Sequence, residues 1–279
     1  MKFALVENER AEATPKSRAT CSACGRTLIA KCGTMVVWHW SHSPVRHCDP
    51  WWENETEWHR AWKNLFPKEL QEIIHTDEVS GERHIADVKT TDSTVIEFQN
   101  SAMSPAELAS RENFYKKMLW IVNAQPFKAH FHILHQLPPP ESPLTSKLHI
   151  LRPPRFPLKP DQTGYRPTND PVFAMDEDIT MKGEGFVAYN LGFVGVGGKR
   201  WSSTEAAQEK IADAYDGHHY LDWRRPRNVW FASSMPVYFD LGDEVLWHLQ
   251  RFKDEHFSVK WLRKADFIRT HSSAFPGDA

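Results

Sequence analysis

Two short apolar runs, separated by a polar segment, carry acidic residues where a buried strand normally has none. The runs are residues 83–88 and 95–99, and the segment between them is rich in Ser, Thr and Asp. Because side chains alternate along a strand, Glu97 and Gln99 share one face of the second run. The pattern predicts a hairpin that brings Asp87, Glu97 and Gln99 onto one surface.

Acidic side chains in an apolar strand need a compensating positive charge, because burying an unpaired carboxylate costs several kcal/mol. A divalent cation is one solution, since Mg²⁺ prefers one or two carboxylates together with water and phosphate oxygens. Such an ion polarises a phosphate and activates water, which favours phosphoryl chemistry. The alternative is structural: Asp87 caps a turn at the end of its strand, and Glu97 pairs with a neighbouring Lys or Arg.

A helical pattern precedes this hairpin, over residues 50–65. Its apolar stripe consists of Trp51, Trp58, Trp62 and Leu65. Beside the stripe lie Glu57, His59 and Lys63, of which His59 and Lys63 are four residues apart and face one way. Glu57 is a candidate third acid, His59 a candidate proton carrier, and Lys63 a candidate group for holding phosphate or positioning water. The alternative is a solvated helix face with ordinary ion pairs.

A second helix is predicted after the hairpin. Ser104 is its N-cap, Pro105 suits the first helical position, and Glu107 completes a capping box, so the helix should run to about residue 117. Residues 118–124 are apolar and predict a buried strand. The order strand, strand, helix, strand is typical of an α/β fold in which the last strand pairs beside the first two. Arg111 and Tyr115 lie one turn apart and either line the cleft or, for Tyr115, pack in the core.

All four cysteines lie between residues 21 and 48. The pattern Cys-x2-Cys-Gly at residues 21–25 is typical of a knuckle that wraps backbone amides around thiolate-bound zinc. A hairpin follows, and two completions of a tetrahedral site remain open: one uses His39 and His42, the other His42 and Cys48. We favour the set Cys21, Cys24, His42 and Cys48. The zinc would be structural, because a unit of ~40 residues buries too little surface to fold without one.

The remainder of the chain predicts two further regions. Proline recurs through residues 137–185, which indicates a linker or extended arm. Residues 186–279 resume alternation and predict a C-terminal α+β region, with strands at 228–232 and 237–241 and a helix at 242–251. The expected domains are therefore a zinc module at 1–50, a core at 51–136, the linker and the C-terminal region.

Charge and hydropathy narrow the possible partners. The 34 Lys and Arg are balanced by 36 Asp and Glu, so any nucleic-acid contact must be a local patch. Twelve Trp residues suit packing and also stacking on bases. No run approaches the ~18 apolar residues of a membrane span, and the first 20 residues do not form a signal peptide. A cytoplasmic protein without membrane partners is expected.

The hairpin motif D-x9-E-x-Q resembles the active-site hairpin of the PD-(D/E)xK nuclease superfamily, with Gln99 where lysine is usual. Over roughly residues 20–120, an ordered set of motifs is similar to the CoiA-like family of competence-associated, nuclease-like proteins. The set consists of E-x-H-x3-K (Glu57, His59, Lys63), A-D-V (residues 86–88), E-F-Q-x-S (residues 97–101) and R-x3-Y (Arg111, Tyr115). A Cys-x2-Cys with a downstream His-x2-His also precedes the nuclease part in that family.

The resemblance implies an α/β restriction-endonuclease-like core that hydrolyses DNA with Mg²⁺ or Mn²⁺, in DNA uptake, recombination or phage defence. The ligands of the metal ion would be Asp87 and Glu97, with Glu57 as a third acid. Gln99 supplies only a neutral dipole, so the metal or Lys63 must carry the positive charge. DNA contacts would come from Arg83, Arg111 and Tyr115, although Arg83 could instead anchor Asp87. The alternative is a DNA-binding adaptor that keeps the scaffold without cleaving.

Overall fold

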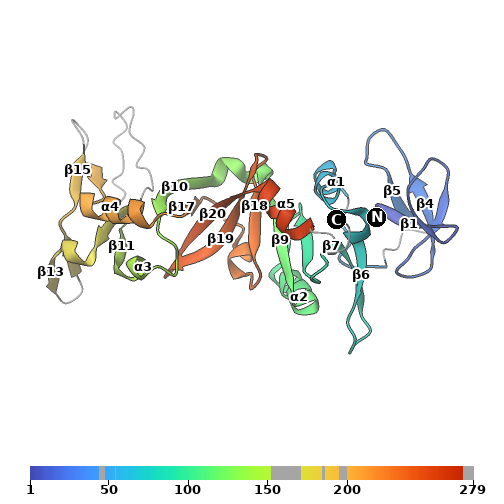
Figure 1. The fold of residues 1–279 in the computed structure, drawn as a ribbon, viewed down its shortest axis with the longest axis horizontal. Helices are drawn as coiled ribbons and strands as arrows, with labels where there is room; N and C mark the ends of the chain where they lie inside the picture. The colour runs from blue at the N-terminus through green and yellow to red at the C-terminus, as the bar shows by residue number, and fades with distance from the viewer. Residues whose placement is uncertain (44–47, 54, 152–170, 184–185, 195–199, 273–279) are drawn as a thin grey trace, which may run out of the picture. The chain divides into compact units, whose positions relative to one another are not determined.

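The computed structural model describes residues 1–43, 48–53, 55–151, 171–183, 186–194 and 200–272 (Figure 1). The chain forms two compact units. The first comprises Met1–Pro126, Arg227–His248 and Leu262–Ala279, and the second comprises Phe127–Pro226 and Leu249–Trp261. The protein is α/β with a large mixed sheet, as predicted. None of the helices that the structure describes is long and apolar enough to cross a membrane.

The N-terminal part of the first unit is a five-stranded antiparallel sheet in the order β2-β1-β3-β4-β5. Its inner face buries Ala4, Ala19, Leu28 and Trp40. Alternation along such short strands is brief, which is why residues 1–20 gave no strand prediction. The strands are β1 (Phe3–Val6), β2 (Glu9–Glu12), β3 (Arg18–Thr20), β4 (Thr27–Lys31) and β5 (His39–His42).

A mixed sheet forms the centre of the first unit, with neighbouring strands in the order β18-β9-β8-β7-β6. β6 to β8 are antiparallel, whereas β8, β9 and β18 run parallel to one another. Helix α2 (Pro105–Tyr115) connects β8 to β9, so the predicted order strand, strand, helix, strand is confirmed. The strands are β6 (Gln71–Thr76), β7 (Arg83–Lys89), β8 (Val95–Gln99), β9 (Met118–Asn123) and β18 (Val237–Asp240).

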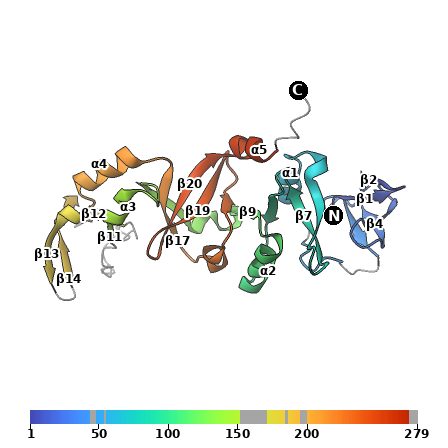
Figure 2. The ribbon, with the colours of Figure 1, turned by 60° about the horizontal axis from the view of Figure 1, so that its bottom comes forward.

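Helices cover both faces of this sheet (Figure 2). On one face, Trp62 of α1 (Glu57–Lys63) and Phe267 of α5 (Lys264–Ser272) pack with Ile96 and Ile121. On the other face, α2 lies over Trp120, whose indole donates to the carboxylate of Glu112 at 3.1 Å. Helix α1 begins seven residues later than the predicted residue 50, because Thr56 is its N-cap and accepts a hydrogen bond from the backbone amide of His59. The predicted helix over residues 50–65 was therefore too long.

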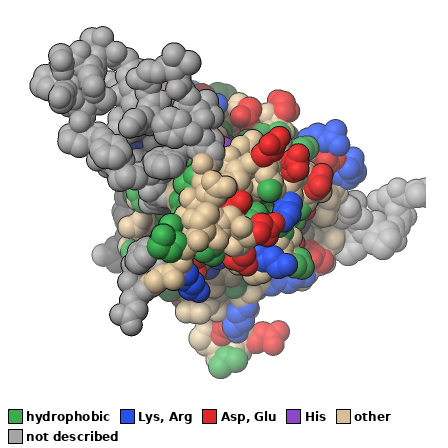
Figure 3. Space-filling view, turned by 90° about the vertical axis from the view of Figure 1, so that its left-hand side faces the viewer, with side chains coloured by type: hydrophobic (Ala, Val, Ile, Leu, Met, Phe, Trp, Pro, Cys, Tyr) green, Lys and Arg blue, Asp and Glu red, His purple; other side chains and the backbone are tan. Residues whose placement is uncertain are grey.

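The second unit has its own core, in which Leu137, Phe173, Ile211 and Tyr220 are buried together. On the face drawn in Figure 3, basic and acidic side chains are interspersed. The elements of this unit are β10 (Phe131–Leu137), α3 (Pro143–Lys147), β11 (Leu148–Leu151), β12 (Val172–Met175), β13 (Ile179–Gly183), β14 (Phe186–Tyr189), β15 (Gly192–Val194), β16 (Arg200–Ser202), α4 (Glu205–Ala214) and β17 (His218–Trp223). Strands β19 (Val245–Lys253) and β20 (His256–Arg263) contribute residues to both units.

The C-terminal third differs most from the sequence-based expectation. Residues 242–251, predicted as a helix, belong largely to strand β19, and residues 228–232, predicted as a strand, form the 3₁₀ helix η4 (Asn228–Ala232). The expected domain boundaries also differ from those of the two units. Strand β18 falls within the expected C-terminal region, 186–279, but joins the central sheet beside β9. The expected linker contains α3, β11, β12 and β13, and its residues 152–170 lie outside the described part of the chain.

Candidate functional site

A cavity of about 80 Å³ lies in the first unit, between α1, α2 and the central sheet. This volume holds several water molecules or a hydrated ion. Among the described residues of its wall are six carboxylates, the side-chain cations of Lys63 and Arg111 and the N-terminal residue Met1, whose ammonium acts on Glu72, so negative charge is in excess. The acids are Asp49, Glu53, Glu55, Glu72, Asp87 and Glu97.

Asp87 and Glu97 meet where β7 and β8 cease to pair through their backbones. The last paired positions before them are Val88 and Ile96. Beyond these paired positions, carboxylates take the place of backbone acceptors. The amide of Asp87 donates to Oε1 of Glu97 at 3.2 Å, and the amide of Phe98 donates to Oδ2 of Asp87 at 3.0 Å. The predicted hairpin is confirmed, and it brings both acids into one cavity wall.

Lys63 enters the cavity from α1 and binds three carboxylates. Its Nζ lies 2.9 Å from Asp87, 3.1 Å from Glu72 and 3.7 Å from Glu55. Burial alone would lower the pKa of Lys63, but the three carboxylates outweigh it and hold that pKa well above its ordinary value. Lys63 is therefore a permanent cation beside Asp87.

Glu97 is the least compensated acid of the cavity. Burial, and then repulsion from Asp87, raise the pKa of Glu97 to about 8, against the attraction of Arg111. Nη1 of Arg111 lies 3.3 Å from Glu97, while its Nη2 donates to the carbonyl of Trp51 and to Glu107. The Nε of Arg111 is buried and finds no hydrogen-bond acceptor among the described residues. The wall thus holds both an under-neutralised acid and an unused N–H donor.

His59 lines the cavity, whereas Gln99 is not among its lining residues and acts beside it. The amide of Gln99 donates to Glu53 and to the hydroxyl of Ser101 at 3.1 Å, and that hydroxyl also donates to Glu53 at 2.6 Å. Nε2 of His59 donates to the carbonyl of Phe98 at 2.6 Å, and its Nδ1 lies 2.9 Å from the hydroxyl of Thr56. Gln99 therefore positions an acid, and both nitrogens of His59 already have partners.

Two of the predicted residues lie away from this site. Glu57 is exposed on the first turn of α1, and Arg83 is exposed on β7; neither lines the cavity. Arg111 and Tyr115 do line it, although both are buried rather than presented on a surface. Sequence reasoning missed four acids of the wall: Asp49, then Glu53 and Glu55 just before the helix, and Glu72, which has a positive φ of 45°. The dense acidic run at residues 53–57 was the available signal.

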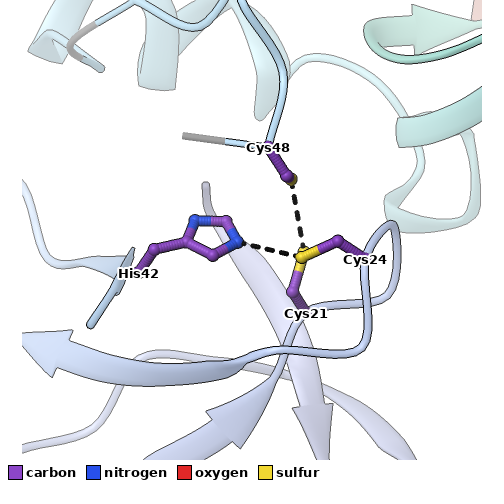
Figure 4. Close-up of side chains that lie close together, drawn as sticks. All are labelled: Cys21, Cys24, His42 and Cys48. Carbon is purple, nitrogen blue, oxygen red and sulfur yellow. Dashed lines mark hydrogen bonds between the residues drawn. The ribbon is translucent and has the colours of Figure 1, made fainter. Parts of the chain in front are cut away.

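A second cluster lies in the N-terminal sheet. The ligand atoms of Cys21, Cys24, His42 and Cys48 all lie within 4.8 Å of one another (Figure 4). Sγ of Cys21 is 3.8 Å from Sγ of Cys48, and Sγ of Cys24 is 3.3 Å from Nε2 of His42. Zinc bonded to sulfur at about 2.3 Å and to nitrogen at about 2.0 Å would separate two tetrahedral sulfurs by about 3.8 Å, and sulfur from nitrogen by about 3.5 Å. This donor set could hold a metal ion.

The local backbone explains how the cysteine cluster forms. The amide of Gly25 donates to the carbonyl of Cys21 at 2.9 Å, and Gly25 has a φ of +72°, which favours glycine at the end of the knuckle. Burial and the neighbouring thiols raise the pKa of Cys48 to about 12, so the thiols need a cation to ionise. His39, the alternative ligand, instead has its Nδ1 2.8 Å from the carbonyl of Val37. The favoured set is the one that the structure brings together.

Among the described residues, the Cys and His cluster is the group of three or more possible ligands whose donor atoms converge. The carboxylates of the cavity are spread around it and engaged by Lys63, Arg111 and backbone amides. Comparison with protein-family models, with curated proteins and with solved structures finds no match for this chain. The function therefore has to be argued from the two sites themselves.

Proposed function

We propose that the cavity is the active site of a metal-dependent DNA nuclease with a restriction-endonuclease-like core. The observation that carries the proposal is that acids from two adjacent strands, Asp87 and Glu97, share one small cavity with Lys63, which comes from a helix. The connection from β8 through α2 to the parallel strand β9 supports an α/β core at this site.

The residues of the cavity fit a divalent cation. Apart from Glu97, five carboxylates face the cations of Lys63, Arg111 and the N-terminal ammonium, which leaves net negative charge, and Mg²⁺ takes carboxylate oxygens together with water and phosphate. Asp87, Glu97 and Glu53 would hold the ion. When bound, it would polarise the scissile phosphate and lower the pKa of a bound water. The thiolate cluster would hold a structural Zn²⁺ in the N-terminal sheet, since soft ligands in tetrahedral array select zinc.

The protein's own groups have distinct tasks in this mechanism. Lys63, fixed by Asp87 and Glu72, supplies the positive charge that steadies a phosphate or orients the attacking water. Arg111 offers its unused Nε–H near the same wall and limits the repulsion between Asp87 and Glu97. Gln99 acts through Glu53, which it holds in place together with Ser101.

The test is cleavage of linear, nicked and single-stranded DNA with Mg²⁺ or Mn²⁺. Asp87→Asn and Glu97→Gln should each reduce the rate on the order of 100-fold or more, the size expected when one electrostatic contact to the reacting phosphate is lost. The matched control is Asp92→Asn, in the exposed turn between the same two strands, which should leave the rate unchanged. Equal rates for Asp87→Asn and the wild-type protein would contradict the proposal.

A non-cleaving DNA-binding protein on the same scaffold is a second candidate, favoured by one observation. Lys63 lies 2.9 Å from Asp87, and Arg111 lies 3.3 Å from Glu97, so both acids are in ion pairs. A metal ion would have to compete with these cations. Tight DNA binding without cleavage under every metal would support this second function.

A further inference from the structure

The N-terminal module contains a long stretch without a single acidic side chain. Residues 13–48 contain no Asp or Glu, but they include the five basic residues Lys16, Arg18, Arg26, Lys31 and Arg46. This segment therefore carries a charge of +5 in a chain whose net charge is −2. A local concentration of this kind is the electrostatic footprint expected of a surface that binds phosphates.

The sheet register places two of these cations on one outward face. Arg18 lies opposite Ile29, which lies opposite Ser41, and Lys31 lies opposite His39. Residues opposite each other project from the same side of a sheet, and residues two apart on one strand do so as well. The other side carries the buried Leu28 and Trp40, so Arg18 and Lys31 point away from the core, and both are exposed.

The loop between β4 and β5 adds exposed apolar side chains beside this face. Met35, Val36 and Trp38 are 92%, 56% and 47% exposed. The indole N–H of Trp38 donates to the carbonyl of Gly33 at 3.1 Å, which holds the side chain against its own loop. An aromatic side chain held in place but exposed beside cations suits stacking on an unpaired base.

This loop is connected to the proposed active site through Arg60 of α1. Nη2 of Arg60 donates to the carbonyl of Trp38 at 2.9 Å and to Oε2 of Glu55 at 2.8 Å, and Glu55 lines the cavity. The acidic cavity itself repels a phosphate backbone. Affinity for a nucleic-acid strand must therefore come from positive surface outside it.

We propose that the outward face of β3 and β4, together with the Trp38 loop, holds a single-stranded segment of the nucleic acid on which the cavity acts. Arg18 and Lys31 contact backbone phosphates, and Trp38 stacks on a base. The inference rests on the proposed function for the nature of the substrate. A single strand is the occupant, because the bases of a duplex are already stacked and do not offer their faces.

The test of stacking is fluorescence anisotropy with a labelled oligothymidylate and the full chain, without added divalent cation. Trp38→Ala should weaken binding about ten-fold, the effect expected for one lost stacking contact. The control is Trp261→Ala, since Trp261 is 42% exposed in the second unit and should not affect binding. An equal effect of the two substitutions overturns the inference.

The test of phosphate contact is the salt dependence of the same binding. Replacing Arg18 and Lys31 by serine should lower the slope of log K against log salt by roughly 1.4, because each phosphate contact to a single strand contributes about 0.7. Serine at the exposed Lys147 and Lys182 of the second unit is the charge-matched control, with no change expected. The inference is overturned if the Arg18 and Lys31 substitutions leave the salt slope unchanged. It is also overturned if duplex DNA binds as tightly as the single strand and its binding is insensitive to Trp38→Ala. An RNA oligonucleotide in parallel shows whether the contact distinguishes the sugar.

Failure of this inference is distinguishable from failure of the nuclease. Asp87→Asn should abolish cleavage and leave oligothymidylate binding intact, whereas Trp38→Ala should weaken binding with the cavity unaltered. Trp38-dependent binding without cleavage under any metal supports the binding face and removes the nuclease. Cleavage that persists, together with binding that is insensitive to substitution of Trp38 and Arg18, supports the nuclease and removes the binding face.

Discussion

Two aspartates in different strands of the same sheet, Asp240 of β18 and Asp87 of β7, show how surroundings separate a structural acid from a proposed functional one. Asp240 accepts hydrogen bonds from the indoles of Trp58 and Trp62 and pairs with Lys264 at 2.8 Å. Burial would raise the pKa of Asp240, but these donors lower it, so the acid is ionised and fully satisfied. Asp87 instead lines a cavity with other acids. The strand pattern alone does not distinguish the two.

The third acid of the proposed metal site can be tested by comparing two glutamates four residues apart. Glu53 lines the cavity and is held by Gln99 and Ser101, whereas Glu57 is exposed outside it. Glu53→Gln should weaken Mg²⁺ binding roughly 10- to 100-fold, the usual loss when a group around a bound metal is removed. Glu57→Gln should have no effect. Calorimetric titration with Mg²⁺ measures both, and a larger effect of Glu57→Gln would restore the sequence-based assignment.

The buried Glu72 predicts a pH dependence of stability. It accepts hydrogen bonds from the amides of Lys2 and Phe3 at 2.7 and 2.9 Å and pairs with Lys63 at 3.1 Å. Burial would raise the pKa of Glu72, but Lys63 and these amides lower it to about 2. Because the folded pKa is depressed, the stability from this group is complete above its unfolded pKa of about 4.3 and is lost as the pH falls toward 2.

The size of this contribution is about 3 kcal/mol, from a shift of roughly two units at 1.36 kcal/mol each. Urea unfolding from pH 7 to pH 2 measures it. Glu72→Gln should flatten the pH dependence between pH 4.5 and pH 2 relative to the wild-type protein. Because other carboxylates titrate in the same range, the comparison is between the two slopes, and identical slopes would rule out this role of Glu72.

Individual elements were predicted from the sequence where local signals and packing agree. Helix α2 begins where Ser104 caps it, and β7 and β8 have their expected limits to within a residue, because caps, alternation and burial coincide there. Strand β19 carries polar and charged residues that suit a helix or a strand equally, and its partners β18 and β20 decide the outcome. The convergence of Glu53, Glu55 and Glu72 depends on such long-range pairing, so the sequence could not show it.

Helix α1 is positioned by Asp240 of β18, which also binds α5 through Lys264. Asp240→Ala should lower the free energy of unfolding by about 3 kcal/mol, because it leaves two indole donors and the half-buried ammonium of Lys264 without their acceptor. Asp243→Ala, at an exposed position three residues later, is the control and should change stability by less than about 0.5 kcal/mol. Equal midpoints and slopes in denaturant for both variants would show that Asp240 does not anchor the helix.

At the scale of the first unit, the N-terminal sheet and the cavity are one structure. Strand β1 supplies the amides that bind Glu72, and Glu72 in turn fixes Lys63 beside Asp87. The cysteine cluster lies in the same sheet, with Cys21 and His42 buried and Cys48 just ahead of Asp49, a residue of the cavity wall. Loss of a metal ion bound at this cluster should therefore affect the proposed active site through β1 and Asp49.

Removal of the metal gives the last prediction. The purified protein should contain one zinc ion per chain, and Cys21→Ser should lower both the zinc content and the melting temperature. Without a metal the cysteines stay protonated as thiols and no longer join the β3–β4 knuckle to residue 48. Cys32→Ser is the matched control, since Cys32 lies outside the cluster. Added zinc should raise the melting temperature of the metal-stripped wild-type and Cys32→Ser proteins, but not that of Cys21→Ser. If Cys32→Ser and Cys21→Ser lost zinc alike, the four-residue assignment would fail, and if neither lost it, the cluster would not be the metal site.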